Sequence, residues 1–278
     1  MTDDARLPRY QVYAIRYATR EGRRQDNFIG GDPHDGPMPM DYFCWLAIGP
    51  ERRFVIDCGF TAAVAAQRKR TFLRDPVDAL KLFDIAAEDV EDVILTHLHY
   101  DHVGNFDRFA NARFHLQEPE LAYATSKYMR HPFLSHAFEV EDVVGMVRLN
   151  YRGRVVFHNG DAELAPGLRL HLAGGHSAGL QFVSVHTERG WVTLASDVTH
   201  YYENMESGRP FTTTFHIGDT LEGYDKLRAV APSPEHIVPG HDPLVMELYP
   251  PARPGLEGVA VRLDVAPKPR AIIPKSHA

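Results

Sequence analysis

The chain has 278 residues, of which 44% are hydrophobic and 24% charged, and its formal net charge is -7 at pH 7. This length and composition predict a globular protein with a sizeable core and exclude a disordered or fibrous chain. The negative charge argues against a nucleic-acid partner, because phosphate binding needs a basic surface. No apolar run approaches the roughly 18 to 20 residues of a membrane span. The acidic N-terminus does not resemble a signal peptide, so we expect a cytoplasmic protein without membrane contact.

Short apolar runs bounded by turn residues recur along the chain and predict β-strands. They cover residues 42–49, 52–59, 92–96, 112–117, 154–158, 168–175, 180–187, 191–197 and 235–240. Helix-like segments lie between them, at residues 60–73, 75–85, 118–129 and 220–230. Strands and helices mixed along one uninterrupted chain predict a layered α/β fold.

The remaining segments complete the predicted organisation, a single domain over residues 1–278. Residues 123–154 lack a clean period and are interpreted as an insertion that forms a lid, with an ordinary surface excursion as the alternative. Residues 264–278, rich in proline and basic residues, are expected to form a C-terminal tail. Cys44 and Cys58 lie in apolar runs and are predicted to be buried and free. The basic cluster at 68–70 is interpreted as a solvated helix face.

The segment THLHYDHVGN (96–105) begins a set of polar residues that follow predicted strands. The members of this set are His97, Asp101, His102, His176, Asp197 and His241. In α/β proteins, sites form beyond the carboxyl ends of strands, so these side chains are expected to meet at one sheet edge.

Imidazole and carboxylate groups together suit a divalent ion, for which zinc is favoured and iron, manganese or cobalt are alternatives. We expect two ions that share a bridging water or hydroxide. The predicted ligands are His97, His99 and His176 for one ion, Asp101, His102 and His241 for the other, and Asp197 as the bridge.

The motif HLHYDH, followed by GGHSAG, ASD and PGHD, resembles the metallo-β-lactamase fold superfamily over roughly residues 42–243. FVIDCG, which contains Asp57, is similar to an early strand motif of that family. The resemblance implies an αββα sandwich with a dimetal site at its edge. The segment SDVTHYYENMESGRPF (196–211) is similar to the N-acyl homoserine lactonase branch. That branch implies a quorum-quenching lactonase, in which a metal-bridging hydroxide opens an N-acyl homoserine lactone or a related lactone.

The resemblance also implies roles for individual residues. Asp101 is expected to deliver a proton to the leaving group. His200 stands where those lactonases carry a tyrosine, so His200 or the adjacent Tyr201 is expected to contact the substrate carbonyl. The candidate substrate-binding residues are Tyr100, Phe133, Phe138, Phe211, Phe215 and His216. Ordinary core packing is the alternative interpretation of these aromatic residues.

Two other function classes stay open. A metal-dependent thioesterase or carboxylic esterase would use the same ions and differ only in its pocket. A non-catalytic metal-binding module is the more distant alternative. The expected partner is a small-molecule lactone or ester, and the sequence leaves open whether the chain forms a homodimer.

Overall fold

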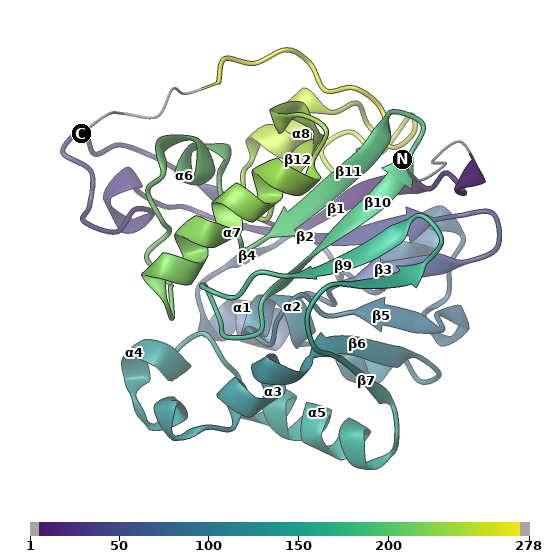
Figure 1. Cartoon of the computed structure of the whole chain (residues 1–278), viewed down its shortest axis with the longest axis horizontal. Helices are drawn as coiled ribbons and strands as arrows, with labels where there is room; N and C mark the ends of the chain where they lie inside the picture. Colours follow the sequence, from purple (N-terminus) through teal and green to yellow (C-terminus); the bar gives the residue numbers. More distant parts are fainter. Residues whose placement is uncertain (1–5, 273–278) are drawn as a thin grey trace.

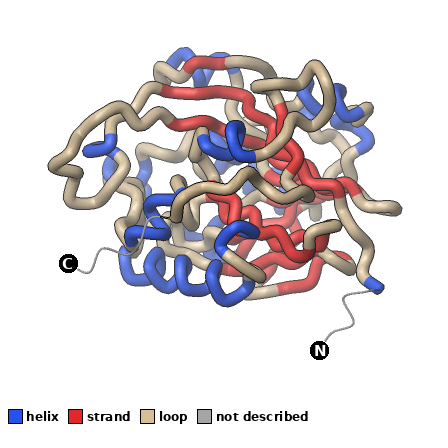
Figure 2. The backbone as a smooth tube through the Cα atoms, turned by 90° about the horizontal axis from the view of Figure 1, so that it is seen from above, coloured by secondary structure: helices blue, strands red, loops and turns tan. Residues whose placement is uncertain are grey.

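The computed structural model describes residues 6–272. Two β-sheets pack face to face, and helices cover their outer faces, so that the layers run helix, sheet, sheet, helix (Figure 1). Viewed from above, the strands run through the middle of the molecule and the helices lie toward its periphery (Figure 2). This arrangement is the predicted αββα sandwich.

The first sheet has the order β13-β1-β2-β3-β5-β6-β7, with β4 paired to β1. Its antiparallel part ends at β3, and the pairs β3–β5, β5–β6 and β6–β7 are parallel. The strands are β1 (Gln11–Arg20), β2 (Met40–Ile48), β3 (Arg53–Ile56), β4 (Thr71–Phe72), β5 (Asp92–Ile94), β6 (Arg113–Gln117), β7 (Val155–His158) and β13 (Ala260–Arg262).

The second sheet has the order β12-β11-β10-β9-β8 and is antiparallel except for the β11–β12 pair. Its strands are β8 (Ala162–Ala165), β9 (Leu168–Leu172), β10 (Gln181–Thr187), β11 (Gly190–Ser196) and β12 (Ile237–Pro239). The β11–β12 pair is parallel, so the carboxyl ends of these two strands lie at the same edge of the sheet.

The helices are short. The α-helices are α1 (Ala62–Gln67), α2 (Tyr100–Val103), α3 (Glu118–Ala124), α4 (Pro132–Ser135), α5 (Val140–Tyr151), α6 (Tyr202–Ser207), α7 (Ile217–Val230) and α8 (Leu244–Leu248). The 3-10 helices are η2 (Arg24–Asp26), η3 (Asp78–Phe83), η4 (Ala87–Asp89), η5 (Phe106–Arg108), η6 (Lys127–Arg130) and η7 (Pro234–His236). No helix within residues 6–272 combines the length and apolar character that a bilayer crossing needs.

Strand β2 shows why the central strands read as unbroken apolar runs. Phe43, Trp45 and Ala47 point into the core between the two sheets, whereas Leu46 joins the core under the outer helices. Side chains alternate between the faces of a strand, so a strand covered on both faces must be apolar at every position. Cys44 is buried and free, as is Cys58, which confirms the prediction for both.

Several elements differ from the sequence prediction. The segment 60–73 holds only the short α1, capped by the Thr61 hydroxyl, which accepts from Val64 N, and then turns into β4. The segment 75–85 forms the 3-10 helix η3. Strands β1, β8 and β13 were not predicted, although β1 is ten residues long.

The segment predicted as a lid contains a helix that packs on the core. Helix α5 buries Val143, Met146 and Leu149 in the core on the outer face of the first sheet. Its amphipathic pattern was hidden by the irregular segment before it, and a lid role for residues 123–154 stays a prediction. Within 123–154, His136 and Ala137 reach the cavity described below.

The segment predicted as a tail lies, as far as residue 272, on the surface of the same domain. Lys268 N donates to Leu248 O in α8, and the Arg270 guanidinium pairs with Glu206 in α6. Residues 273–278 of the predicted tail lie outside the described residues.

Candidate metal centre

Four loops carry the predicted ligands to one edge of the sandwich. The loop after β5 runs from His97 into α2 and supplies the HLHYDH motif. The loops after β9, β11 and β12 supply His176, Asp197 and His241, respectively. All seven predicted ligands are buried, and they form overlapping groups whose ligand atoms lie within 4.8 Å of one another. The strand-end placement therefore brings these side chains together as the sequence predicts.

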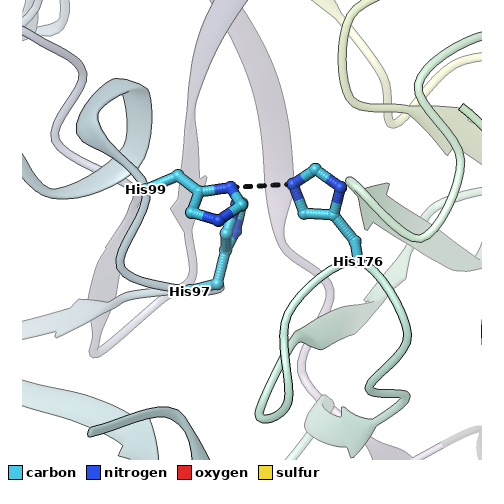
Figure 3. A group of neighbouring side chains, drawn as sticks. All are labelled: His97, His99 and His176. Atoms are coloured by element: carbon cyan, nitrogen blue, oxygen red, sulfur yellow. Dashed lines mark hydrogen bonds between the residues drawn. The ribbon is translucent and has the colours of Figure 1, made fainter. Parts of the chain in front are cut away.

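Three imidazoles form the first group. His99 Nδ1 lies 3.0 Å from His97 Nε2 and 2.8 Å from His176 Nε2, and Figure 3 shows the rings of His99 and His176 facing each other from opposite loops. His176 Nδ1 donates to Thr213 O at 2.6 Å, which leaves the Nε2 lone pair directed at the group. Converging imidazole nitrogens that cannot all donate to one another fit a shared cation.

The second group contains Asp101, His102 and His241. Asp101 Oδ2 lies 3.7 Å from His102 Nε2 and 3.8 Å from His241 Nε2. His241 Nδ1 donates to Asp41 O at 2.9 Å, so its Nε2 also carries a lone pair toward the group. His102 Nε2 is buried and has no hydrogen-bond partner. Because buried polar atoms are nearly always satisfied, this nitrogen fits a metal ligand.

Asp197 lies between the two groups. Its Oδ2 is 3.2 Å from His176 Nε2, and its Oδ1 is 3.4 Å from His102 Nε2 and 3.0 Å from His241 Nε2. One oxygen therefore faces each group, which is the arrangement of a bridging carboxylate. His200 Nε2 lies 3.1 Å from the same Oδ2, a contact that places this ring beside the bridge.

The protein environment favours the protonation states that bind metal at the three imidazoles of the first group and at Asp197. At His102 and His241, burial alone would lower the pKa, but nearby carboxylates, led by Asp197, raise it above the ordinary imidazole value. Burial, with neighbouring imidazoles, holds the pKa of His97 and His99 well below the ordinary value. Burial lowers the pKa of His176 to about 3. Burial alone would raise the pKa of Asp197, but the imidazoles around it, led by His241, lower it well below its usual range. Neutral imidazole and ionised carboxylate are the ligand forms of these groups.

Buried hydrogen bonds outside the ligand set hold the loops in place. The Glu120 carboxylate accepts from Leu98 N at 3.0 Å, Ser177 Oγ at 2.7 Å and Gly179 N at 2.8 Å. Leu98 and Ser177 adjoin ligands from two different loops, so Glu120 ties these loops together. Sequence reasoning missed Glu120, because no local motif marks a carboxylate whose partners lie up to 59 residues away.

A cavity of about 280 Å³ opens over the centre. Its lining residues are Arg20, Asp26, Met40, Tyr42, Arg68, Arg70, His99, Tyr100, Asp101, His136, Ala137, His176, Asp197, His200, Phe211, Thr212, Thr213 and His241. The predicted Tyr100, His200 and Phe211 are among them, and the Phe211 ring stacks on His200 at 3.7 Å between centroids. Arg68 and Arg70 also line the cavity, so the prediction of a solvated face is wrong for these two residues. It holds for the exposed Lys69.

Other predicted contacts lie elsewhere. The Tyr201 hydroxyl donates to Pro39 O at 3.1 Å and accepts from Asn27 Nδ2, outside the cavity lining. Phe133 is 72% exposed, and His216 caps the N-terminus of α7 by accepting from Asp219 N. None of these three residues is among those that line the cavity, and a contact of Tyr201, Phe133 or His216 with a substrate stays a prediction.

Two further aromatic residues support the site from outside the cavity lining. Phe215 packs on Tyr123 with a centroid distance of 4.4 Å and is not among the lining residues, which fits the packing alternative. Phe138 packs edge-on against the His99 ring at 4.6 Å, so it buttresses a predicted ligand. Both therefore follow the packing interpretation.

Comparisons with known proteins agree with this geometry. The profile of the metallo-beta-lactamase superfamily matches residues 38–241. An N-acyl homoserine lactonase of Bacillus thuringiensis is 32% identical over 170 residues, which cover 60% of this chain and 61% of that protein. The chain thus matches less than two thirds of this relative's length.

Solved structures show the same fold. A quorum-quenching N-acyl homoserine lactone lactonase has a TM-score of 0.71 at 23% identity, covering 84% of this chain and 92% of that one. An N-acyl homoserine lactone hydrolase with the product N-hexanoyl-L-homoserine bound at its catalytic metal center also has a TM-score of 0.71, at 21% identity, covering 87% of this chain and 96% of that one. With its motif, its sandwich and its buried ligand set, this chain belongs to the metallo-beta-lactamase superfamily.

Proposed function

We propose that the chain is a dinuclear-metal hydrolase that opens a lactone ring, an N-acyl homoserine lactone or a related lactone. The position of Asp197, with one carboxylate oxygen facing each group of ligands, is the observation that carries this proposal. The names of its relatives support the lactone class. Zinc is the proposed metal, since imidazole and carboxylate ligands suit it.

His97, His99 and His176 would hold one ion, Asp101, His102 and His241 the other, and Asp197 would bridge them. Two bound divalent ions supply a water of lowered pKa for attack on the ester carbonyl and Lewis acidity toward both of its oxygens. Everything else in the reaction rests on the side chains that line the cavity.

Asp101 is the proposed proton carrier. Its carboxylate lines the cavity and is 10% exposed, so it can take up the proton that the attacking water releases and pass it to the ring oxygen of a bound lactone. Ring opening leaves an alkoxide, which must be protonated, and a carboxyl group within reach serves as general acid.

His200 is proposed as a positioning residue. Its Nε2 lies 3.1 Å from Asp197 Oδ2, and its ring stacks between the rings of Phe211 and His241. We propose this interaction with the bridge as the role of His200, in place of the carbonyl contact expected from the sequence. It keeps the Asp197 carboxylate in the orientation that faces both ligand groups.

A substrate panel with measured metal content tests the proposal. Purified protein would be assayed on homoserine lactones, simple γ- and δ-lactones, thioesters and a phosphodiester. We expect lactones to be hydrolysed fastest, and Asp101→Asn to lower kcat by 10²-fold or more, the range of general acid catalysis. The matched control is Asp225→Asn, which changes an exposed carboxylate paired with Arg228 far from the site.

Each other outcome favours a different class. Faster hydrolysis of thioesters or open-chain esters than of any lactone would favour the esterase alternative. No hydrolysis by fully metallated protein would favour a metal-binding module. Normal turnover of Asp101→Asn at matched metal content would remove Asp101 from the acid role.

A further inference from the structure

We propose that the substrate of this cavity carries a carboxylate, which the guanidinium groups of Arg20 and Arg70 bind while the ester lies on the metal centre. This inference rests on the proposed lactone hydrolysis and specifies its substrate class. It follows from how charge is distributed on the cavity wall.

The fold brings two arginines together at the cavity. Strands β1 and β4 are antiparallel, and their register pairs Ala18 with Phe72 and Thr19 with Thr71. The next positions along the two segments are Arg20 and Arg70. Like charges at opposed positions of a strand pair repel each other. Their approach therefore calls for an anion to compensate it.

No carboxylate of the described residues, 6–272, lies close enough to Arg20 or Arg70 to form an ion pair. The Nε of Arg20 is buried without a hydrogen-bond partner, and one of its terminal nitrogens makes a long contact of 3.4 Å to Asn27 Oδ1. Arg70 Nε donates to the Tyr100 hydroxyl at 3.2 Å. Asp26 also lines the cavity, but it is exposed and pairs with neither arginine.

Arg68, the third arginine that lines the cavity, differs from Arg20 and Arg70 because it has a carboxylate partner. Arg68 forms an ion pair of 2.7 Å with Glu139, and its guanidinium lies over the Tyr100 ring at 3.9 Å from the centroid. Its charge is therefore already compensated, and it fixes the segment 136–139 at the rim. Arg20 and Arg70 alone among the lining arginines remain available to a ligand.

The contacts between Arg70 and the metal centre indicate that a small molecule can reach both. Tyr100 links Arg70 to the adjacent ligand Asp101, and the Tyr42 hydroxyl lies 3.3 Å from that of Tyr100. The Tyr42 ring in turn packs edge-on against His241 at 5.3 Å. One tyrosine, Tyr100, thus separates the Arg70 guanidinium from the adjacent ligand Asp101. A five- or six-membered lactone with a carboxylate on its ring spans such a gap within 280 Å³.

The wall is poorly suited to a long acyl chain. Met40, Ala137 and Phe211 are its lining residues whose side chains lack nitrogen and oxygen. Arginine is well suited to a carboxylate, because its planar donors bind both oxygens. The chain as a whole carries a net charge of -7, so the local positive charge of Arg20 and Arg70 would also guide an anion to this opening.

Paired substrates test the proposal. We would compare kcat/KM for γ-butyrolactone-γ-carboxylate and its neutral carboxamide at matched zinc content. The wild type is expected to prefer the carboxylate by about 10-fold or more, the factor that hydrogen bonds to a charged group contribute. Arg70→Gln and Arg20→Gln are expected to reduce this ratio toward one, and Arg70→Lys to retain part of it. Arg9→Gln, which removes an equal charge from an exposed ion pair, should leave the ratio unchanged.

A binding measurement gives a readout independent of turnover. Calorimetry would compare tetrahydrofuran-2-carboxylate, which has no ester to hydrolyse, with its carboxamide on wild type and Arg70→Gln. Tighter binding of the carboxylate in wild type only supports the proposal. Binding of the tetrahydrofuran carboxylate with equal affinity by both proteins overturns the proposal. So does a wild-type kcat/KM for the lactone carboxamide that equals the value for the lactone carboxylate. If no lactone is hydrolysed, the proposed function fails, and the calorimetry still decides the anion site.

Discussion

His102 Nδ1 lies 2.7 Å from Oδ2 of Asp57, and both residues are fully buried. Asp57 adopts φ 63°, a left-handed conformation that favours glycine, asparagine and aspartate. Its other oxygen accepts from Thr96 N at 2.7 Å. A proton held on Nδ1 leaves the unpartnered Nε2 of His102 free for a metal, so Asp57 orients this ligand.

Asp57→Asn tests that role. Asparagine keeps the size and tolerates the backbone conformation, but it removes the charge that holds the Nδ1 proton. We expect metal affinity to fall 10- to 100-fold, the usual cost of losing such a supporting group. Chelator competition would measure the affinity, with Asp225→Asn as the control. Unchanged affinity would show that His102 is oriented by its other neighbours.

Glu120→Gln should weaken the join between the two ligand loops. The carboxylate accepts from three donors, and an amide would turn its own NH₂ toward at least one of them. A buried donor left unsatisfied costs about 1–3 kcal/mol. Urea unfolding of the variant should show that loss, together with weaker zinc binding. Glu118→Gln, an exposed position in the same helix, is the control. Equal stability of the two variants would contradict the role of Glu120.

Metal removal should destabilise the fold. A ligand that binds only the native state at a thousand times its Kd stabilises it by about 4 kcal/mol. In a chain of this size, that energy corresponds to a Tm decrease of roughly 10 °C. A thermal scan with and without a chelator would measure the shift, and added zinc should restore it. The same chelator should shift a His97→Ala variant less, because this variant lacks a predicted ligand.

Asp142 predicts a pH-dependent stability outside the metal centre. Burial, with Glu139 and Asp107 nearby, raises the pKa of Asp142 to about 7, and its Oδ2 is buried without a partner. The folded protein thus keeps a proton that the unfolded chain loses above its ordinary value of 3.8. The stability contributed by this proton is complete below that value and is lost as the pH rises toward 7.

Asp142→Asn removes this pH dependence. The variant should gain free energy of unfolding relative to wild type between pH 5 and 8, by on the order of 1 kcal/mol once partial exposure is allowed for. Urea titrations at pH 5 and pH 8 would measure the gain, which should be larger at pH 8. Glu141→Gln, in the same helical turn but exposed, should show no such trend. A gain that is equal at both pH values would show that charge is not its cause.

Local sequence was enough to predict which side chains converge at the candidate metal centre. The apolar runs mark strands, and the residues directly after a strand must lie at its carboxyl end. His97, His176, Asp197 and His241 each follow a predicted strand, and the rule that α/β sites form beyond carboxyl ends predicted that they meet at one edge. The unbroken apolar run of β2 likewise marks a strand that is covered on both faces.

Side-chain partners across long stretches of chain could not be predicted in this way. Which residue faces Arg70 depends on the pairing of β4 with β1, and the three donors to Glu120 come from two distant loops. Tyr201 and His200 are neighbours in sequence, yet Tyr201 faces Pro39 and His200 faces Asp197. Hydrophobic periodicity records whether a residue is buried, whereas strand order and loop direction establish what it is buried against. For this reason the sequence alone predicted the set of candidate metal-binding residues, whereas the pairing of Arg20 with Arg70 could be found only in the folded structure.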